Sequence, residues 1–144
     1  MSRRDLPPSA VGLLTRPGLW PFCLSVTVAL FRARLRLRRV RAAEFVRAVP
    51  PTETTPSDAL PGPVARIGWA VPRIAKAMPF RADCLVQAMA AEGLLARRGY
   101  ASEICIGARK TQGSVAAHAW LTHEGRVVTG GEIGGYSRFL TEPV

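Results

Sequence analysis

Hydrophobic and polar residues alternate along the chain with two different periods. Apolar side chains recur at helical spacing over residues 64–78, where Pro72 is expected to interrupt or kink the helix, and again over residues 84–98. Shorter apolar runs follow, bounded by turns that contain Gly or Ser: SEICIGAR (102–109), AAHAWLT (116–122) and RVVTG (126–130). Such runs are typical of strands, and the third is expected to pair with the second across the turn HEG. The C-terminal two-thirds of the chain is therefore predicted to form two helices followed by an antiparallel sheet, an α+β arrangement.

The N-terminal part contains an apolar stretch, LWPFCLSVTVALF (19–31), which runs directly into an arginine-rich one. Because about 18 apolar residues are needed to span a bilayer, this stretch predicts a core or interfacial helix rather than a membrane anchor, and it lacks the cleavage site of a signal peptide. From Leu30 the sequence predicts a helix with an apolar stripe and a strongly basic remainder. That helix either completes the core with its arginines in solvent or contacts an acidic surface.

A proline-rich segment and an uneven charge distribution divide the chain. VPPTETTPSDALPGP contains five prolines, so we expect a basic helical N-terminal region (1–49), a linker (50–63) and a folded core (64–144). Of the 20 Lys and Arg, ten are arginines in the N-terminal region, which holds only two acidic residues. This region is expected to attract an acidic protein surface or the anionic cytoplasmic leaflet. The arginines are not accompanied by a recognised nucleic-acid-binding motif, so no nucleic-acid partner is expected.

The cysteines and histidines do not form a metal or disulfide framework. The chain has three cysteines without a CxxC pair and two histidines without ligand-like spacing, so neither a metal ion nor another cofactor is expected. An odd number of cysteines suits a reducing, cytoplasmic environment. Cys23 and Cys105 lie in apolar runs and are expected to pack in the core, whereas His123 in the HEG turn is expected to be exposed.

Cys84 lies in the first turn of the second predicted helix. Asp83 before it is a favoured N-cap residue, and Gly99 is a favoured residue for the other end of the helix. The unpaired backbone N–H groups and the positive end of the helix dipole favour a thiolate at such a position, and the thiolate is the nucleophilic form of cysteine.

A nucleophilic thiolate also requires an imidazole within hydrogen-bonding reach. The sequence AHAW supplies His118 on a predicted strand between two alanines, with Trp120 on the same face of that strand. These residues predict a Cys84–His118 catalytic pair. A structural cysteine at a helix start and a core histidine would produce the same pattern, and spacing alone leaves both interpretations open.

Three blocks in this order, CLVQAMAAEGLLARRGY, ICIGARK and AHAWLTHEGRVVTGGE, resemble the transglutaminase-like cysteine peptidases of lasso-peptide biosynthesis. The resemblance covers about residues 64–140 and is greatest to the stand-alone peptidase found where the leader-recognition element is a separate protein. It implies a papain/transglutaminase-like core, in which a helix that carries the nucleophile packs on a short antiparallel sheet that carries the base. It also implies that Cys84 and His118 are the catalytic pair.

The third member of the site departs from the family pattern. That pattern includes an aspartate after the histidine to orient the imidazole, but this chain has no aspartate after Asp83. Glu132 in GGEIGGY is the favoured substitute, and Glu124 and Glu142 are poorer candidates. A longer carboxylate can serve, or a backbone carbonyl can hold the ring. Oxyanion donors are expected among the N–H groups at the helix start, including that of Cys84.

The resemblance implies removal of the leader peptide from a ribosomally made precursor before macrolactam closure. An ATP-dependent lasso cyclase, a further partner, would then join the freed N-terminus to an Asp or Glu side chain. Because no segment of the chain resembles a leader-binding element, a separate leader-recognition protein is expected besides the precursor. Two other functions stay open: transglutaminase-like acyl transfer to an amine, and a non-catalytic basic scaffold docked on a membrane or on acidic partners.

Overall fold

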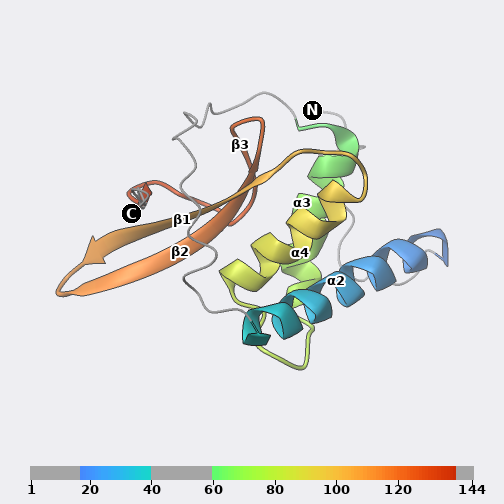
Figure 1. Ribbon diagram of the computed structural model, residues 1–144, viewed down its shortest axis with the longest axis horizontal. Helices are drawn as coiled ribbons and strands as arrows, with labels where there is room; N and C mark the ends of the chain where they lie inside the picture. Colours follow the sequence, from blue (N-terminus) through green and yellow to red (C-terminus); the bar gives the residue numbers. More distant parts are fainter. Residues whose placement is uncertain (1–16, 40–59, 139–144) are drawn as a thin grey trace, which may run out of the picture.

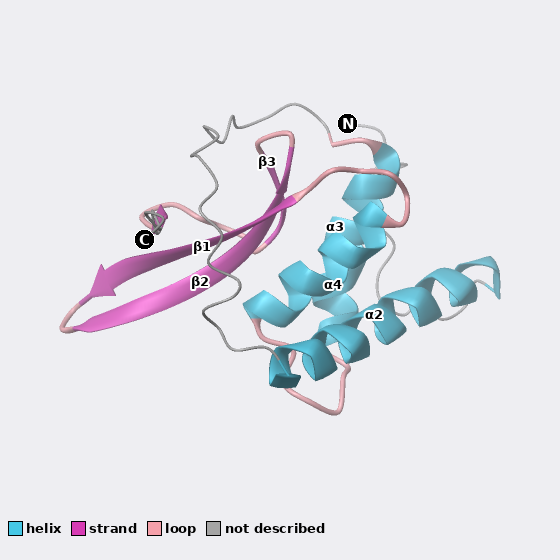
Figure 2. Ribbon diagram, viewed as in Figure 1, coloured by secondary structure: helices cyan, strands magenta, loops and turns pink. Residues whose placement is uncertain are grey.

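The computed structural model describes residues 17–39 and 60–138, which form helices followed by a sheet (Figure 1, Figure 2). The elements are η1 (Pro17–Leu19), α2 (Trp20–Arg39), α3 (Gly62–Ala75), α4 (Cys84–Ala96), β1 (Glu103–Thr111), β2 (Ser114–His123), β3 (Arg126–Thr129) and β4 (Ser137–Arg138). The predicted α+β class is confirmed. Most of the expected linker, the end of the N-terminal region and Glu142 lie outside the described residues.

All strand pairs of the four-stranded sheet are antiparallel, and the strand order is β3-β2-β1-β4. The β1–β2 hairpin is long, running from the pair Glu103–Thr122 to the pair Thr111–Ser114, and its far end reaches away from the helices (Figure 1). The expected turn before β3 is also present. Glu124 and Gly125 both have positive φ, as a two-residue hairpin turn requires. The very short strand β4 was not predicted.

Helix α4 begins at Cys84, as predicted, but it is not capped in the expected way. Asp83 has extended backbone angles and its carbonyl accepts the first helical bond, from the N–H of Gln87. Its carboxylate lies 3.5 Å from the Arg81 guanidinium and does not cap the helix. The predicted end is confirmed, because Gly99 has φ +79° and Tyr100 N–H donates to the Leu95 carbonyl behind it.

Helix α3 is a single helix that continues through Pro72, so an interruption there is wrong, whereas the alternative expectation of a kink stays a prediction. Proline removes one helical hydrogen bond and crowds the preceding turn. Burial of apolar side chains on both sides of Pro72, among them Ile67 and Val71, keeps the helix in place against the core. The physical cause of the error is that tertiary packing outweighs a local helix-breaking preference.

Helix α2 joins the apolar stretch and the start of the arginine-rich stretch into one element. It packs on α3 and α4, and these two helices in turn pack on the strands, so the layers run sheet, α3 and α4, then α2 (Figure 1). Val26, Leu30 and Ala33 are the α2 side chains buried in the common core. Within residues 17–39 and 60–138, no helix is long and apolar enough to cross a membrane.

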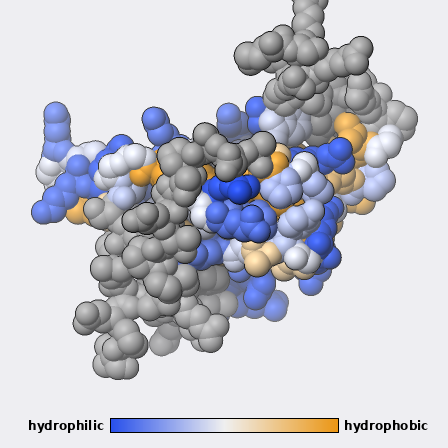
Figure 3. Space-filling model, turned by 90° about the horizontal axis from the view of Figure 1, so that it is seen from above, coloured by the Kyte–Doolittle hydropathy of each residue, from blue (hydrophilic) through white to orange (hydrophobic). Residues whose placement is uncertain are grey.

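The core lies between the helices and one face of the sheet. Ile104 and its cross-strand partner Leu121 belong to the helical cluster, as does Val128 of β3. Burial of a Leu or Val side chain stabilises the fold by about 1.5–3 kcal/mol. The sheet is therefore held to the helices mainly by apolar contacts through β2 and β3. The surface seen from above, in contrast to the core, mixes hydrophilic and hydrophobic side chains (Figure 3).

A close approach between α3 and the sheet depends on Gly68. A Cβ at this position would lie 2.4 Å from the backbone carbonyl oxygen of Val128, whereas a Cβ at Gly93 of α4 would meet nothing within 4 Å. We expect Gly68→Ala to lower the free energy of unfolding by about 1–3 kcal/mol through overpacking. Gly93→Ala should instead raise it by about 0.5–1 kcal/mol, because alanine favours the helix. Chemical denaturation measures both values, and equal stabilisation by the two substitutions would contradict the described α3–β3 contact.

Candidate active site

Cys84 is the first residue of α4, and its thiol is free and half-buried. The first helical hydrogen bond in this turn is donated by Gln87, so the N–H groups of Cys84, Leu85 and Val86 precede the intrahelical bonds. A helix start of this kind presents backbone donors and a positive dipole end next to the sulfur atom. The cysteine therefore stands where a nucleophile and oxyanion donors can occur together.

His118 lies in the middle of β2 and is half-buried. Its Nε2 is 2.6 Å from the carbonyl oxygen of Gly130, in the loop that follows β3. A carbonyl only accepts hydrogen bonds, so Nε2 carries the proton and donates it. The other ring nitrogen, Nδ1, is then the lone-pair-bearing atom, which is the state that a general base requires.

Aromatic rings enclose the imidazole. The ring of Trp120 stacks at a centroid distance of 6.1 Å, which confirms that it shares a strand face with His118, and the ring of Tyr136 lies at 5.1 Å. The guanidinium of Arg109 is 4.7 Å from the Tyr136 ring centre. Gly107 is the cross-strand neighbour of His118 and has no side chain, which leaves room beside the imidazole.

The structure brings the two candidate elements together without joining the two side chains. Helix α4, which begins with Cys84, packs on β2, which carries His118. In the described part of the chain, the hydrogen bond of the His118 ring goes to Gly130, and none links it to the Cys84 sulfur. Side chains alternate along a strand and Leu121 faces the helices, so His118 and Trp120 lie on the opposite face of β2. The two elements are neighbours, and a contact between the Cys84 sulfur and His118 belongs to the proposal below.

Gly130 can hold the imidazole only because it is a glycine. Its φ is +115°, and a Cβ there would lie 2.3 Å from the Cβ of Trp120. Any side chain would therefore displace the loop that carries the carbonyl. A backbone carbonyl was among the groups expected to hold the imidazole, but neither Gly130 nor the contact of Tyr136 with His118 was predicted from the sequence. The Gly130–Gly131 pair at the end of a predicted strand was the available signal for a special backbone conformation.

The two acidic candidates among the described residues, Glu132 and Glu124, lie at the surface. Glu132 is exposed, two residues after Gly130, and its carboxylate has no hydrogen bond to His118. Glu124 is exposed in the β2–β3 turn. The role of Glu132 therefore stays a prediction, and the carbonyl of Gly130 occupies the position next to the ring that an orienting acceptor requires.

The remaining cysteines and the second histidine have structural surroundings. Cys105 is buried, as expected, but Cys23 is only half-buried. His123 is 5% exposed, and its Nδ1 donates to the Ala101 carbonyl, so the expectation of an exposed His123 is wrong. The reason is that β2 extends through this residue before the turn. In residues 17–39 and 60–138, no group of three His, Cys, Asp or Glu side chains is arranged to hold a metal ion.

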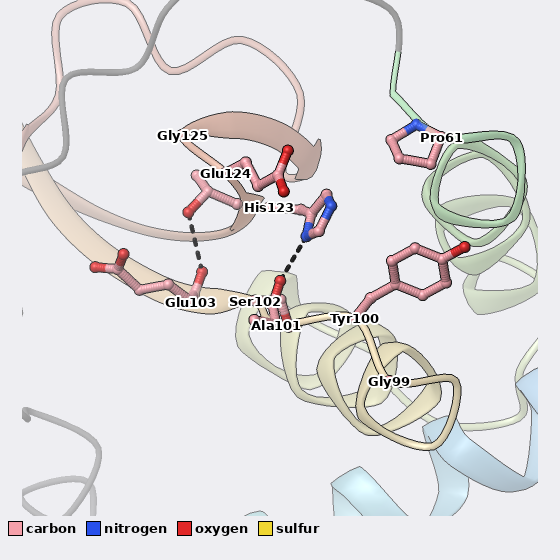
Figure 4. Close-up of a pocket in the computed structure, with 10 residues that line it drawn as sticks. Pro61, Gly99, Tyr100, Ala101, Ser102, Glu103, His123, Glu124 and Gly125 are labelled. Atoms are coloured by element: carbon pink, nitrogen blue, oxygen red, sulfur yellow. Dashed lines mark hydrogen bonds between the residues drawn. The ribbon is translucent and has the colours of Figure 1, made fainter.

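A hollow of about 580 Å³ lies at the C-terminal end of β2 (Figure 4). Its lining includes Pro61, Tyr100, Glu103, His123 and Glu124. Internal hydrogen bonds occupy polar groups on its wall: His123 bonds to Ala101, and Thr122 donates to the Glu103 carbonyl. Neither Cys84 nor His118 lines this hollow. It is therefore separate from the candidate active site.

The fold and the site agree with a family comparison. Residues 24–141 match the model of the transglutaminase-like superfamily, so the chain belongs to this superfamily. Its members are usually Cys–His enzymes, in which a cysteine and a histidine act together. Comparisons with curated proteins and with solved structures gave no match.

The Gly130 hydrogen bond predicts the tautomer of His118. In ¹H–¹⁵N NMR spectra of the imidazoles, we expect the neutral His118 ring to carry its proton on Nε2. Gly130→Ala should abolish this preference and lower the free energy of unfolding by about 1–3 kcal/mol through backbone strain. Gly134→Ala is the matched control, because a Cβ there meets nothing within 4 Å. A proton on Nδ1 in the unmodified protein would contradict the described geometry.

Proposed function

We propose that this protein is a cysteine peptidase that removes the leader peptide from a ribosomally made lasso-peptide precursor before macrolactam closure. In this proposal Cys84 is the nucleophile, His118 is the general base and acid, and the Gly130 carbonyl orients the imidazole. The observation that carries the assignment is the hydrogen bond from His118 Nε2 to Gly130, 2.6 Å long, which leaves the lone pair of Nδ1 to accept a proton. Membership of a superfamily of Cys–His enzymes supports the same assignment.

The first half of the reaction forms an acyl-enzyme. Nδ1 of His118 takes the thiol proton, and the Cys84 sulfur adds to the carbonyl carbon of the scissile peptide bond. The negative oxygen of the tetrahedral intermediate is stabilised by backbone N–H groups at the start of α4, with that of Cys84 as the first candidate. The imidazolium then protonates the leaving nitrogen, which releases the core peptide with a free N-terminal amine.

The second half regenerates the enzyme. His118 removes a proton from a water molecule, which attacks the thioester carbon, and the Cys84 sulfur leaves and takes this proton back from the imidazolium. The leader peptide departs with a new C-terminal carboxylate. Throughout both halves the Gly130 carbonyl accepts the hydrogen bond from Nε2–H and stabilises the imidazolium, the role that a carboxylate has in the family pattern. A neutral acceptor stabilises the imidazolium less than a charged one, so catalysis is expected to be slower than with an aspartate.

Partners of the reaction follow from the same proposal. The precursor is the substrate, and a separate leader-recognition protein presents its leader to Cys84 and His118. A lasso cyclase consumes the freed amine. The acyl-transfer alternative differs only in the acceptor that attacks the thioester, since an amine there would give an amide of the leader instead of a carboxylate.

Substitutions in the pair test the peptidase function. We expect Cys84→Ala and His118→Ala each to lower the rate of leader cleavage by at least about 10³-fold, because a nucleophile and its base act as a unit. The assay combines the chain, the precursor and the recognition protein, and it detects the products by mass spectrometry. Cys23→Ala is the control, since Cys23 is also free and half-buried but lies on α2.

Three outcomes of this assay decide between the proposals. Full cleavage by Cys84→Ala would end the peptidase assignment and leave a scaffold role. An unchanged rate for Glu132→Gln supports Gly130 as the orienting group, whereas a large loss would return that role to Glu132. Adding a primary amine and finding a leader amide in place of the carboxylate would favour acyl transfer.

A further inference from the structure

Helix α2 has two apolar faces, of which one is buried in the core and the other is largely exposed, although Phe31 on it contacts the Phe80 ring. Val26, Leu30 and Ala33 face α3 and α4 and are buried. On the outer side, apolar residues recur every three or four positions and so lie on one side of the helix. This outer stripe consists of Trp20, Leu24, Val28, Phe31 and Leu35, which are between 38 and 64% exposed. Exposed apolar residues scattered singly are ordinary on protein surfaces, but a continuous stripe marks an interaction site.

The outer stripe is accompanied by a concentrated positive charge. Helix α2 carries arginines at five positions, Arg32, Arg34, Arg36, Arg38 and Arg39, and no acidic residue. All of these except the half-buried Arg34 are exposed. They flank the C-terminal half of the stripe, while Trp20 begins its other end. A helix of 20 residues is about 30 Å long, so the combined surface extends over about this length.

We propose that the outer stripe of α2 and its flanking arginines dock on an anionic lipid surface, with the helix lying in the plane of the interface. An interfacial helix has Trp, Phe and Leu on one face and Lys or Arg beside it, and this combination is present here. The stripe belongs to a single helix rather than to a groove between elements, so it can enter a headgroup layer along its full length. Each arginine near such a surface adds attraction that salt weakens.

The position of α2 fits this docking mode. It contacts α3 and α4 on the side away from the sheet, so a lipid surface against α2 leaves His118 and its loop away from the membrane. The inference does not depend on the peptidase function, because it uses only the surface of α2.

Vesicle binding tests the proposal directly. We expect the full chain to co-sediment with vesicles of equal parts phosphatidylglycerol and phosphatidylcholine, and not with pure phosphatidylcholine vesicles. Trp20 fluorescence should shift to shorter wavelength on binding, and Trp20→Phe should remove the shift, since the other two tryptophans are half-buried or buried. Binding should fall in 1 M salt, where the Debye length is about 3 Å.

Two sets of substitutions separate the stripe from the charge. Leu24→Gln with Val28→Gln removes apolar contact and should weaken binding at least about tenfold. Arg32→Gln, Arg38→Gln and Arg39→Gln together should weaken it on the order of a hundredfold. Arg36 is kept, because burial raises the pKa of Glu92 in α4 and the charge of Arg36 opposes that rise.

The matched control removes the same charge elsewhere. Lys76→Gln, Arg97→Gln and Lys110→Gln alter three exposed cations on other elements and should leave binding close to that of the unmodified chain. Equal losses of vesicle binding in this control and in the variant that lacks Arg32, Arg38 and Arg39 would show attraction by net charge alone and overturn the proposal. Equal binding to neutral vesicles would also overturn it. The same holds if the chain does not bind vesicles and instead binds a leader-recognition protein in a salt-sensitive way, or self-associates through contacts that the stripe substitutions abolish. Circular dichroism verifies that each variant retains its fold.

Discussion

The contact between the His118 imidazole and the Gly130 carbonyl is the constraint on which the site depends. It connects the middle of β2 to the loop after β3, and it fixes which ring nitrogen carries the proton. The contact requires close approach of two backbone segments, because a Cβ at Gly130 would collide with Trp120. In the proposed mechanism this main-chain oxygen orients the ring in place of a carboxylate. A neutral acceptor held by packing would then stabilise an imidazolium less than a charged one.

Much of the architecture was predictable, because the deciding signals are local. The start of α4 at Cys84, the glycine that ends it, and the turn at Glu124 and Gly125 depend on backbone preferences of neighbouring residues. The Cys84 and His118 candidates followed from helix-start chemistry and from a resemblance in sequence. The uninterrupted α3 and the burial of His123 were mispredicted, since each depends on contacts with residues distant in sequence.

The hydrogen-bond acceptor of His118 could not have been assigned from side-chain types, because the Gly130–Gly131 pair indicates a special backbone conformation but not which carbonyl meets the ring. Tyr136 was missed for a similar reason: it reaches His118 only after the loop following β3 folds back on the sheet. The two faces of α2 could be predicted from the sequence only in part. Its basic and apolar residues were evident, but which apolar residues face the core and which remain exposed is decided by the packing of α2 on α3 and α4.

The central claim, that Cys84 is an activated thiol served by His118, is tested most directly by the relative reactivity of the cysteines. Limited alkylation of the folded chain with iodoacetamide at neutral pH, mapped by mass spectrometry, compares all three thiols in one sample. Cys23 is the internal reference because it is free and half-buried like Cys84, and Cys105 is buried. The account predicts that Cys84 reacts at least about tenfold faster than Cys23, and that His118→Ala removes this advantage. Equal rates at Cys84 and Cys23, or a fast Cys84 that is indifferent to His118, would contradict it.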